Sequence, residues 1–356
     1  MSNTRIQNVM DNLQKMGLTQ LLISDMTAIY YLTGQRFFPG ERLVLLHIST
    51  GGNTLYLNEL SQETEPIKDV ETIRFSLGDD GLSRVIKGIG KGALGVDKNL
   101  PARYLIPLLH ESGAGDVIVA SEAVDRARAR KDIQEQAYMA ESSEINDRAM
   151  EQFEKLIQEG VTERGVQEQM RGIYKELGAD DIGFGFSAFG ANAAEPHHAS
   201  DDTVLKEGDC VVLDVGCIKY GYFSDMTRTF FYKSVSGRHR EIYEIVKLAN
   251  ETAQKIVRPG VRFSDIDRTA RDIIAAAGYG EYFIHRLGHS IGLQMHEYGD
   301  VSAYNDDLVE EGMIFSIEPG IYLPGDFGVR IEDLVLATEN GVRSLNGYSK
   351  ELKVID

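Results

Sequence analysis

The sequence has little positive charge and no long apolar run. Its 37 Lys and Arg residues are outnumbered by 55 Asp and Glu residues, which gives a net charge of -18. Proteins bind nucleic acids and anionic membranes through basic patches, so we expect neither partner here. No stretch reaches the roughly 18 apolar residues that would span a bilayer. The opening residues, MSNTRIQNVM, lack an apolar core of signal-peptide length, which predicts a cytoplasmic protein.

Cysteine is also scarce, since Cys210 and Cys217 are the only two. They stand seven residues apart in one strand-like stretch, so their side chains point to opposite faces of that strand. Two residues so placed on a single extended segment cannot form a disulfide. We expect both cysteines to be small buried packing residues and not metal ligands.

The 356 residues are enough for two domains. Residues 1–124 alternate helical and strand patterns, which predicts an α/β domain, and they contain no glycine-rich phosphate loop. The expected helices cover 6–16, 82–89 and 102–112, and the expected strands cover 20–24, 42–49, 54–58 and 117–120. The charged run 125–132, DRARARKD, is interpreted as a linker. Apolar residues at helical spacing predict one long helix over 133–158, which opens a second domain over 133–356.

The second domain contains an acidic hairpin within residues 207–231, EGDCVVLDVGCIKYGYFSDMTRTFF. Two β-branched and aromatic runs flank Lys219-Tyr220-Gly221, which is a turn signal. A turn centred on residue 219 or 220 places Asp214 almost directly opposite Asp225, with β-carbons about 5 Å apart. Two carboxylates at that distance repel each other unless one is protonated or a cation lies between them. A metal site, a calcium loop and a plain solvated face all remain possible for one such hairpin.

The acidic hairpin occurs twice. Residues 311–320, EGMIFSIEPG, align without a gap on residues 207–216, so that Glu318 takes the place of Asp214. A turn centred on Gly325 then places Glu318 opposite Glu332. The repeat extends upstream, because residues 160–178 match residues 260–278 at a constant offset of 100 positions, each as an amphipathic helix ended by Gly. The repeat predicts a pseudo-symmetric domain whose two halves face each other across a shared metal site.

The segment Arg286-Leu287-Gly288-His289-Ser290 supplies a fifth candidate ligand, His289. With Asp214, Asp225, Glu318 and Glu332 it makes four carboxylates and one imidazole, which are too many anionic groups for one divalent ion and suit two. Oxygen ligands with a single nitrogen favour manganese, and cobalt or zinc would also bind. Two such ions activate a shared water and polarise a carbonyl or phosphoryl oxygen, so the expected reaction is hydrolysis.

Further histidines lie in the loops that precede the hairpins. His197 and His296 are candidates for a general acid or a donor to an oxyanion, with His198 as a neighbour of His197. Arg330 stands two residues before Glu332, so on a strand it shares that face and would orient the carboxylate. An exposed strand arginine is the alternative interpretation of Arg330. His285, four residues before His289, is expected to support or line the site.

The motifs together resemble a known family. The run PHHASDD followed by GDCVVLDVG and GYFSDMTRTF, then GHSIGLQMHE, SIEPGIY and GVRIED, resembles the pita-bread metallopeptidases of the creatinase and methionine aminopeptidase superfamily. Within that superfamily the likeness is to Xaa-Pro dipeptidases (prolidases) and aminopeptidase P enzymes. The motifs cover residues 133–356, and residues 1–124 are compatible with the N-terminal creatinase-like domain of the family.

The resemblance implies a mixed α/β (α+β) fold with a duplicated pita-bread catalytic domain, a cytoplasmic homodimer and two divalent metal ions, commonly manganese or cobalt. It implies metal ligands at Asp214, Asp225, His289, Glu318 and Glu332, with Asp225 and Glu332 bridging the ions. His197 and His296 match positions that assist the tetrahedral intermediate, and Glu318 matches the position that activates a metal-bridging hydroxide. The implied reaction is cleavage of the bond before proline in a dipeptide or short peptide.

The same resemblance leaves several points open. His285 and Tyr322 are candidate substrate contacts, as are Glu41 and Arg42 in the loop 38–42, which the likeness places in the pocket of a partner subunit. Dipeptidase members often follow the second His-Glu pair with a Pro and a nearby Arg, whereas this chain continues Tyr298-Gly299-Asp300, so dipeptides and longer peptides both remain possible. A metal-independent creatinase-like hydrolase and a non-catalytic pita-bread binding module are the alternatives, and both typically lack the full ligand set.

Overall fold

The computed structural model describes residues 2–61, 65–76 and 78–356, so positions 1, 62–64 and 77 of the predicted N-terminal domain lie outside the described residues. Internal contacts divide the chain into two compact units, Met1–Arg128 and Ala129–Asp356. Most of the run predicted to be a linker, 125–132, belongs to a helix, α5 (Glu122–Ala129). The charged residues of that run therefore do not form an extended connection, and a linker function for it stays a prediction.

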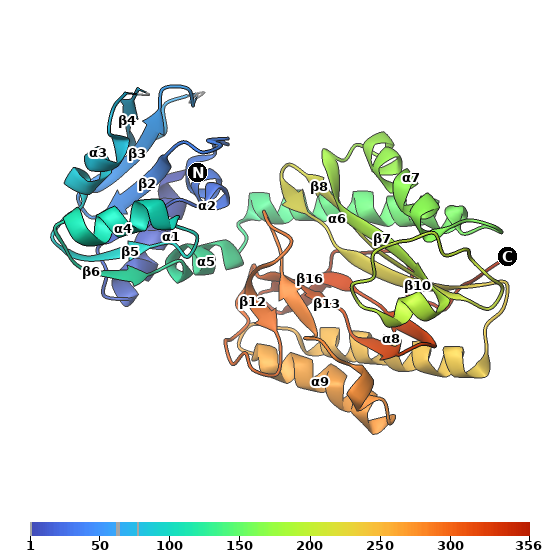
Figure 1. Cartoon of the computed structure of the whole chain (residues 1–356). Coiled ribbons are helices and arrows are strands. Elements are labelled where there is room, and N and C mark those ends of the chain that lie inside the picture. Colours follow the sequence, from blue (N-terminus) through green and yellow to red (C-terminus); the bar gives the residue numbers. More distant parts are fainter. Residues whose placement is uncertain (1, 62–64, 77) are drawn as a thin grey trace. The chain divides into compact units, whose positions relative to one another are not determined.

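The N-terminal unit is a mixed α/β fold built on a six-stranded sheet in the order β4-β3-β2-β1-β5-β6 (Figure 1). Its strands are β1 (Gln20–Ile23), β2 (Val44–Ser49), β3 (Gly52–Asn58), β4 (Glu71–Phe75), β5 (Gly92–Val96) and β6 (Ala114–Val119). Its helices, besides α5, are α1 (Ser2–Lys15), α2 (Met26–Thr33), α3 (Gly81–Gly88) and α4 (Ala102–Glu111). The seven elements predicted from sequence are present in this unit, while α2, β4, β5 and α5 were missed because each is short and weakly periodic.

The C-terminal unit contains two five-stranded sheets and a two-stranded ribbon. One sheet has the order β18-β10-β8-β7 with β9 paired to β8, the other has the order β12-β11-β13-β16-β17, and β14 pairs with β15. The first sheet is made of β7 (Asp181–Phe189), β8 (Cys210–Lys219), β9 (Tyr222–Phe223), β10 (Met226–Tyr232) and β18 (Val354–Ile355). The second sheet is made of β11 (Gly288–Ser290), β12 (Glu297–Val301), β13 (Ile314–Ile317), β16 (Asp333–Thr338) and β17 (Gly341–Ser344), and the ribbon of β14 (Gly320–Leu323) and β15 (Phe327–Arg330).

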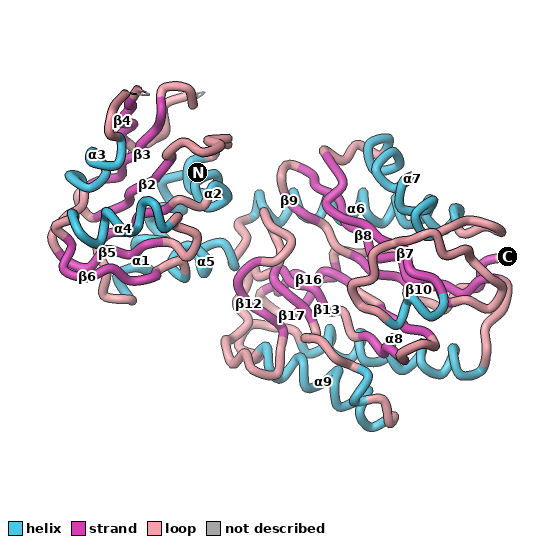
Figure 2. The backbone as a smooth tube through the Cα atoms, in the orientation of Figure 1, coloured by secondary structure: helices cyan, strands magenta, loops and turns pink. Residues whose placement is uncertain are grey.

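Four long helices enclose these strands, and Figure 2 shows the strands of this unit in magenta between them. They are α6 (Ile133–Phe153), α7 (Glu163–Glu176), α8 (Gly237–Ile256) and α9 (Phe263–Ala276), and three 3-10 turns are η1 (Glu154–Leu156), η2 (Gly190–Ala194) and η3 (Gly280–Tyr282). Side chains of α6 and α7 pack with β8 in one hydrophobic core, and those of α8 and α9 pack in a second core with strands of both sheets.

The sequence repeat is a structural repeat. The helices α7 and α9 begin and end at an offset of 100 residues, as predicted. Gly160 and Gly260 before them have φ of 80° and 88°, and Gly178 and Gly278 after them have φ of 93° and 87°. This left-handed conformation is accessible mainly to glycine, which explains why the same residue recurs at each boundary.

Two predicted helix limits differ from the structure. The helix α6 ends at Phe153 and continues only as a 3-10 turn, five residues before the predicted end at 158. It begins at a capping box, in which Asp132 and Glu135 each accept a bond from the other's backbone amide.

The region 235–240 was expected to be an exposed connection, but α8 already begins at Gly237. His239 was expected to be solvated, but its ring stacks on Phe231 with centroids 5.3 Å apart.

The two cysteines lie as predicted. Both are free and buried, and Cys210 belongs to the core that contains α8 and α9, while Cys217 belongs to the core that contains α6 and α7. Strand alternation across β8 explains this division between the two faces. In the part of the chain that the structure describes, no helix is long and apolar enough to cross a membrane.

Both thiols are expected to be unreactive in the folded protein. Burial raises the pKa of Cys210 to about 12 and also raises the pKa of Cys217, so the reactive thiolate is scarce at both positions. Native protein mixed with Ellman's reagent at pH 8 should show almost no fast colour change, and both thiols should react once the chain is unfolded in guanidinium chloride. Rapid reaction of one thiol per native chain would contradict the burial described here.

Candidate metal centre

The first acidic hairpin has a different register from the predicted one. Strand β8 pairs with β10 so that Asp214 lies opposite Thr227 and not opposite Asp225. The two turn residues are Tyr220 and Gly221, both with positive φ (52° and 82°), so the pairing is centred between them. The prediction of direct opposition is therefore wrong by two residues. Because side chains alternate with a period of two, Asp225 still projects from the same face as Asp214, at the diagonal position.

The second hairpin has the predicted register. Gly320 pairs with Arg330 in the ribbon, and Ile317 pairs with Asp333 in the adjoining sheet, so Glu318 and Glu332 fall opposite each other between the two pairings. A tight turn with Gly325 at φ 74° joins the ribbon strands. The Glu332 amide donates to the carbonyl of Thr227 at 3.1 Å, which attaches this hairpin to β10 of the other sheet. The two acidic hairpins therefore meet directly.

Three ligand-type side chains converge at this junction, one from strand β11 and two from the short connections before β10 and before β16. Asp225, His289 and Glu332 are all buried, and one oxygen or nitrogen atom of each lies within 4.8 Å of the others. The Nε2 atom of His289 is 3.5 Å from Oδ2 of Asp225 and 3.5 Å from Oε1 of Glu318, which adds a fourth member. His289 lies in β11, directly after Gly288, where a β-carbon would come within 1.9 Å of the Ser316 carbonyl oxygen. Glycine is therefore required for β11 to approach β13.

Asp214 joins the group through Arg330. The buried guanidinium donates to Oδ2 of Asp214 at 2.6 Å, to the Tyr322 hydroxyl at 2.9 Å and to Oγ1 of Thr227 at 3.1 Å. The predicted partner of Arg330 was Glu332, whose Oε2 instead accepts a bond from Thr227 at 2.7 Å. The prediction assumed that Arg330 and Glu332 lie in one strand, where residues two apart share a face. Strand β15 ends at Arg330, so this alternation does not extend to Glu332.

Three buried carboxylate oxygens of this group have no hydrogen-bond partner among the described residues. They are Oδ1 of Asp214, Oδ1 of Asp225 and Oε1 of Glu332. A buried carboxylate oxygen without a partner loses its hydration and gains nothing in return, which is strongly unfavourable. Divalent cations between the hairpins would satisfy all three atoms. Four carboxylates with one imidazole are a donor set for hard to borderline divalent ions, so the residues fit the predicted metals.

The electrostatics of the group point the same way. Burial raises the pKa of Asp225 to about 7, and the charges of Asp214 and Glu318 contribute to the increase. Burial and the neighbouring carboxylates also raise the pKa of Glu332 well above its ordinary value. Burial alone would lower the pKa of His289, but its contact with Asp225 and the charge of Glu318 raise it overall. The raised pKa values of the two carboxyls arise first from burial and then from neighbouring negative charge, and a bound cation would favour the ionised form of both.

Two histidines near the group, His296 and His285, are neutral at physiological pH. The His296 ring meets the His289 ring edge to face at 4.4 Å, and burial together with the charges of His289 and Arg286 lowers the pKa of His296 to about 4. Burial also lowers the pKa of His285, whose Nε2 lies 2.9 Å from the Tyr322 hydroxyl. His197 is exposed. Of the two predicted catalytic histidines, His296 contacts the candidate ligand His289, whereas His197 is an exposed loop residue. The catalytic roles of both stay predictions.

The remaining predicted contacts are divided between the two units. Tyr322 is 2% exposed and links His285 to Arg330, so in this structure it supports other site residues from below the surface. Glu41 and Arg42 are exposed in the loop between α2 and β2 of the N-terminal unit, where the Glu41 carbonyl accepts a bond from Arg103 at 2.9 Å. A role for these residues in substrate binding stays a prediction.

Two hydroxyl residues that hold the ligands were missed from the sequence. Thr227 donates to Glu332, and Ser316 donates to Oε1 of Glu318 at 3.0 Å while accepting the His289 amide at 2.9 Å. Thr227 stands two residues after Asp225, and Ser316 stands two residues before Glu318. The period of two along a strand was therefore a signal that could have identified both.

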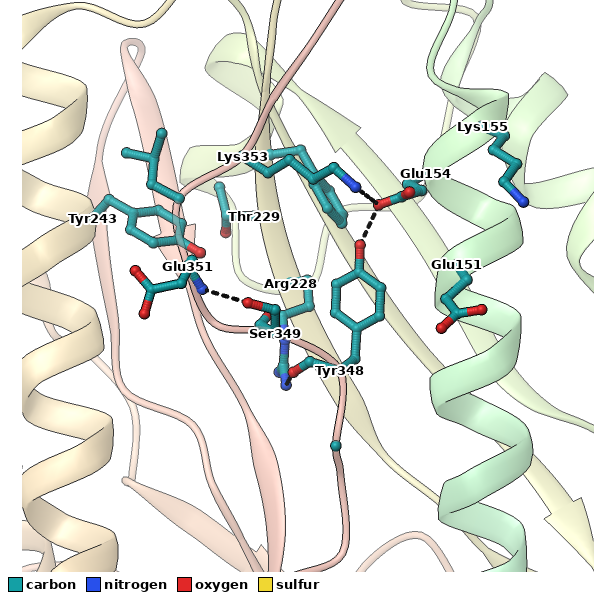
Figure 3. A pocket seen from close by; sticks show the side chains of 13 residues that line it. Glu151, Glu154, Lys155, Arg228, Thr229, Tyr243, Tyr348, Ser349, Glu351 and Lys353 are labelled. Atoms are coloured by element: carbon teal, nitrogen blue, oxygen red, sulfur yellow. Dashed lines mark hydrogen bonds and ion pairs between the residues drawn. The ribbon is translucent and has the colours of Figure 1, made fainter.

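Arg228, on the opposite face of β10 from Thr227, supports the site from behind. It donates to the Glu332 carbonyl at 2.6 Å, to Oδ1 of Asp333 at 2.7 Å and to the carbonyls of Tyr348 and Ser349 at 2.7 and 3.1 Å. Figure 3 shows Arg228 beneath the segment that carries Tyr348 and Ser349, beside a cavity of about 560 Å³. The Arg228–Asp333 ion pair is buried, with both side chains 1% exposed.

Replacing Arg228 by Met should strongly destabilise the C-terminal unit. The substitution removes a buried partner of Asp333 and the donors to the carbonyls of Glu332, Tyr348 and Ser349, while Lys350 still pairs with Asp333. We therefore expect a loss of about 3 kcal/mol, the lower end of the range for breaking a buried ion pair. In a domain of about 200 residues this corresponds to a fall in melting temperature of roughly 10 °C. The matched control is Arg238→Met, because the exposed Arg238–Asp326 pair should contribute less than about 1 kcal/mol. Equal effects of the two substitutions in thermal unfolding would refute this ranking.

The chain resembles known proteins over its whole length. Residues 137–339, more than half of the chain, match the model of metallopeptidase family M24, and residues 5–130 match the creatinase/prolidase N-terminal domain. An uncharacterized peptidase of Staphylococcus aureus is 36% identical over 354 residues, which are 98% of this chain and 100% of that protein.

Two solved structures are similar in both fold and sequence. A dipeptidase from Pyrococcus horikoshii has a TM-score of 0.92 and 34% identity, with 99% of this chain and 100% of the other chain covered. A Xaa-Pro dipeptidase from Bacillus anthracis has a TM-score of 0.92 and 29% identity, with both chains covered completely. These similarities extend over both units, so they include the acidic hairpins and the N-terminal unit alike.

Proposed function

The chain belongs to metallopeptidase family M24, and we propose that it uses two divalent ions to cleave the bond before proline in dipeptides or short peptides. Within the family it is a dipeptidase or prolidase type of enzyme, with a creatinase-like N-terminal domain and a pita-bread catalytic domain. The observation that carries this proposal is the convergence of four carboxylates and one imidazole, with three buried carboxylate oxygens left unpartnered. Such a group is costly to bury unless cations bind it.

In this proposal Asp214, Asp225, His289, Glu318 and Glu332 hold the ions, and Asp225 and Glu332 contact both of them. When bound, the two ions would lower the pKa of a water molecule and polarise the scissile carbonyl. Mn²⁺ is the proposed metal because oxygen donors predominate, and Co²⁺ or Zn²⁺ would also fit. Thr227, Ser316 and Arg330 hold the carboxylates of Glu332, Glu318 and Asp214 in place through the hydrogen bonds described above.

The other site residues would handle protons and developing charge. Glu318 has one oxygen bonded to Ser316 and a side chain that is 16% exposed, so its carboxylate is available to accept a proton from the attacking water. His296 is neutral because its pKa is about 4, and its ring N–H would donate a hydrogen bond to the oxygen that gains charge. His197, exposed in the loop before β8, would assist the same intermediate or protonate the leaving nitrogen.

The specificity for proline is supported by similarity to the Xaa-Pro dipeptidase from Bacillus anthracis. A proline nitrogen in a peptide bond carries no hydrogen, so a site selective for it need not provide an acceptor there. We also propose that the protein is a cytoplasmic homodimer, in which the exposed loop 38–42, with Glu41 and Arg42, reaches the partner's pocket. Phe38 in this loop is 89% exposed, so its ring is available to a second chain.

Peptide hydrolysis with defined metals tests the proposed function. The metal-free protein is assayed against Xaa-Pro dipeptides and Xaa-Pro-Yaa tripeptides, with Mn²⁺, Co²⁺ and Zn²⁺ supplied in turn. We expect release of proline from dipeptides with Mn²⁺ giving the highest rate, and no hydrolysis with EDTA. The same dipeptides with alanine in place of proline are the substrate control. Hydrolysis that is independent of metal, or equal for proline and alanine substrates, would refute the proposal.

A further inference from the structure

A second buried carboxylate lies outside the metal centre. Glu163, the first residue of α7, is completely buried. Its Oε1 accepts bonds from the Phe189 amide at 2.7 Å and from Asn192 Nδ2 at 3.0 Å. Its Oε2 accepts bonds from His198 Nε2 at 2.7 Å and from the Asp201 amide at 3.0 Å. One carboxylate therefore collects four donors.

All four donors lie on the segment 189–201, which connects β7 to β8 and contains His197. Apart from the short turn η2, this segment has no helix or strand of its own. Glu163 binds it at both ends, through Phe189 and Asp201, and next to His197, through His198. The backbone of Glu163 adds to these contacts, because its carbonyl accepts the Ser187 hydroxyl at 2.8 Å.

The group formed by Glu163, His198 and Asp201 has the composition of a metal site, and its ligand atoms lie within 4.8 Å of one another. It nevertheless differs from the metal centre, where one oxygen of each of three carboxylates is buried without a partner. Both oxygens of Glu163 already accept two hydrogen bonds, which satisfies the carboxylate without a cation. The bonds of Glu163 therefore favour an anchoring function.

The structural repeat provides an internal comparison. At the offset of 100 residues the counterpart of Glu163 is Phe263, which begins α9 and is 2% exposed. The equivalent helix of the second copy therefore begins with a buried apolar residue at this position. A buried carboxylate is far more costly than a buried phenyl ring unless its charge is bonded, so the acid is not explained by the repeated fold. The second copy holds its histidine-bearing segment through a different acid, Asp267 of α9, which accepts the Leu287 amide at 3.1 Å.

We propose that Glu163 is a positioning residue, which fixes the segment 189–201 and thereby sets the position of the His197 imidazole that this segment carries. The side chain of His197 is exposed, whereas the ring of its neighbour His198 is hydrogen-bonded to Glu163 at 2.7 Å. This inference rests on the proposed function, in which His197 assists hydrolysis. Among the described residues, the hydrogen bonds of the Glu163 carboxylate all go to the segment 189–201 and none to a candidate metal ligand, so we infer that Glu163 acts through this segment.

The first test is a double-mutant cycle on the manganese-loaded enzyme, with Glu163→Gln, His197→Ala and the combined variant. Misplacing a catalytic group by about 1 Å can lower the rate by about 100-fold, so Glu163→Gln should lower kcat by roughly tenfold to a hundredfold. Its Kd for Mn²⁺ should stay unchanged, because the ligands lie outside the segment. The double variant should be no slower than His197→Ala alone. Losses that multiply, or weaker Mn²⁺ binding, would overturn the proposal.

The second test does not depend on activity. Hydrogen exchange measured by mass spectrometry should become faster in peptides covering 187–203 of Glu163→Gln, while peptides covering α7 and β8 keep the exchange of the wild type. Unchanged exchange in 187–203 would overturn the proposal. If the wild type itself fails to hydrolyse any peptide, the proposed function fails, whereas this measurement still decides whether Glu163 fixes the loop.

A pair of variants at His198 covers the case in which Glu163→Gln does not fold. His198→Leu removes one donor to Glu163, whereas His198→Gln retains a side-chain N–H. We expect lower kcat and faster exchange in 187–203 for His198→Leu, with recovery of both in His198→Gln. Equal behaviour of the two variants would contradict an anchoring hydrogen bond.

Discussion

Replacing Glu332 by Gln is expected to remove nearly all hydrolysis of an Xaa-Pro dipeptide while the protein remains folded. Substituting a residue that only supports a metal ligand lowers activity by up to about 100-fold. The loss of activity in Glu332→Gln should be larger, because Glu332 is proposed to contact both ions. An amide of the same shape keeps a carbonyl oxygen for the Thr227 hydroxyl, so the local hydrogen bond at 2.7 Å is retained. Proline release and circular dichroism on the same samples check both parts of the prediction.

The control for this substitution is Glu339→Gln, an exposed residue that follows β16. Its activity and melting temperature should match those of the wild type. Without metal, Glu332→Gln should be at least as stable as the wild type at neutral pH, because burial of an ionised Glu332 is unfavourable and an amide avoids it. Wild-type turnover in Glu332→Gln, or collapse of its fold, would contradict the assignment of Glu332 as a metal ligand.

The metal-free protein is expected to lose stability as the pH rises from about 4 to about 7. An unfolded Asp has a pKa of about 3.9, and in the folded protein burial raises the pKa of Asp225 to about 7. Between these values the folded state keeps a proton that the unfolded state releases, so the free energy of unfolding falls with increasing pH. A difference of about three pKa units corresponds to roughly 4 kcal/mol, and the loss is complete above pH 7.

Thermal unfolding in EDTA at several pH values measures this effect. Added Mn²⁺ should raise the melting temperature most above pH 7, where the Asp225 carboxyl is ionised. Asp225→Asn should flatten the dependence on pH between 4 and 7, whereas Asp272→Asn, an exposed residue of α9, should leave it unchanged. An equal dependence in the wild type and Asp225→Asn, or no stabilisation by Mn²⁺, would contradict a raised pKa at Asp225 and its role as a metal ligand.

Local sequence signals determined the second hairpin better than the first. Pro324 and Gly325 leave one favourable turn, and the predicted opposition of Glu318 and Glu332 is confirmed. The first turn uses Tyr220 at φ 52°, a conformation that residues other than glycine rarely adopt. The sequence-based prediction therefore placed the centre of this turn before its observed position between Tyr220 and Gly221. The strand period preserved the face of Asp225 despite this error, which is why the grouping of the acids was still predictable.

Contacts between the two copies were not predictable from sequence. Arg330 and Asp214 are 116 residues apart, and nothing in their local patterns identifies them as partners. The same holds for Arg228 with Asp333, and for Glu163 with the segment 189–201. Periodicity identifies which face a side chain occupies, whereas these pairings depend on how two sheets and their loops pack together.

The most direct test of this account is the number of Mn²⁺ ions that one chain binds. Metal-free protein is titrated with Mn²⁺ by calorimetry, and the bound metal is confirmed by elemental analysis after dialysis. The account predicts two ions per chain for the wild type and fewer for Glu332→Gln, with Glu339→Gln unchanged. A wild-type chain that binds no divalent ion, or the same number in Glu332→Gln, would contradict it.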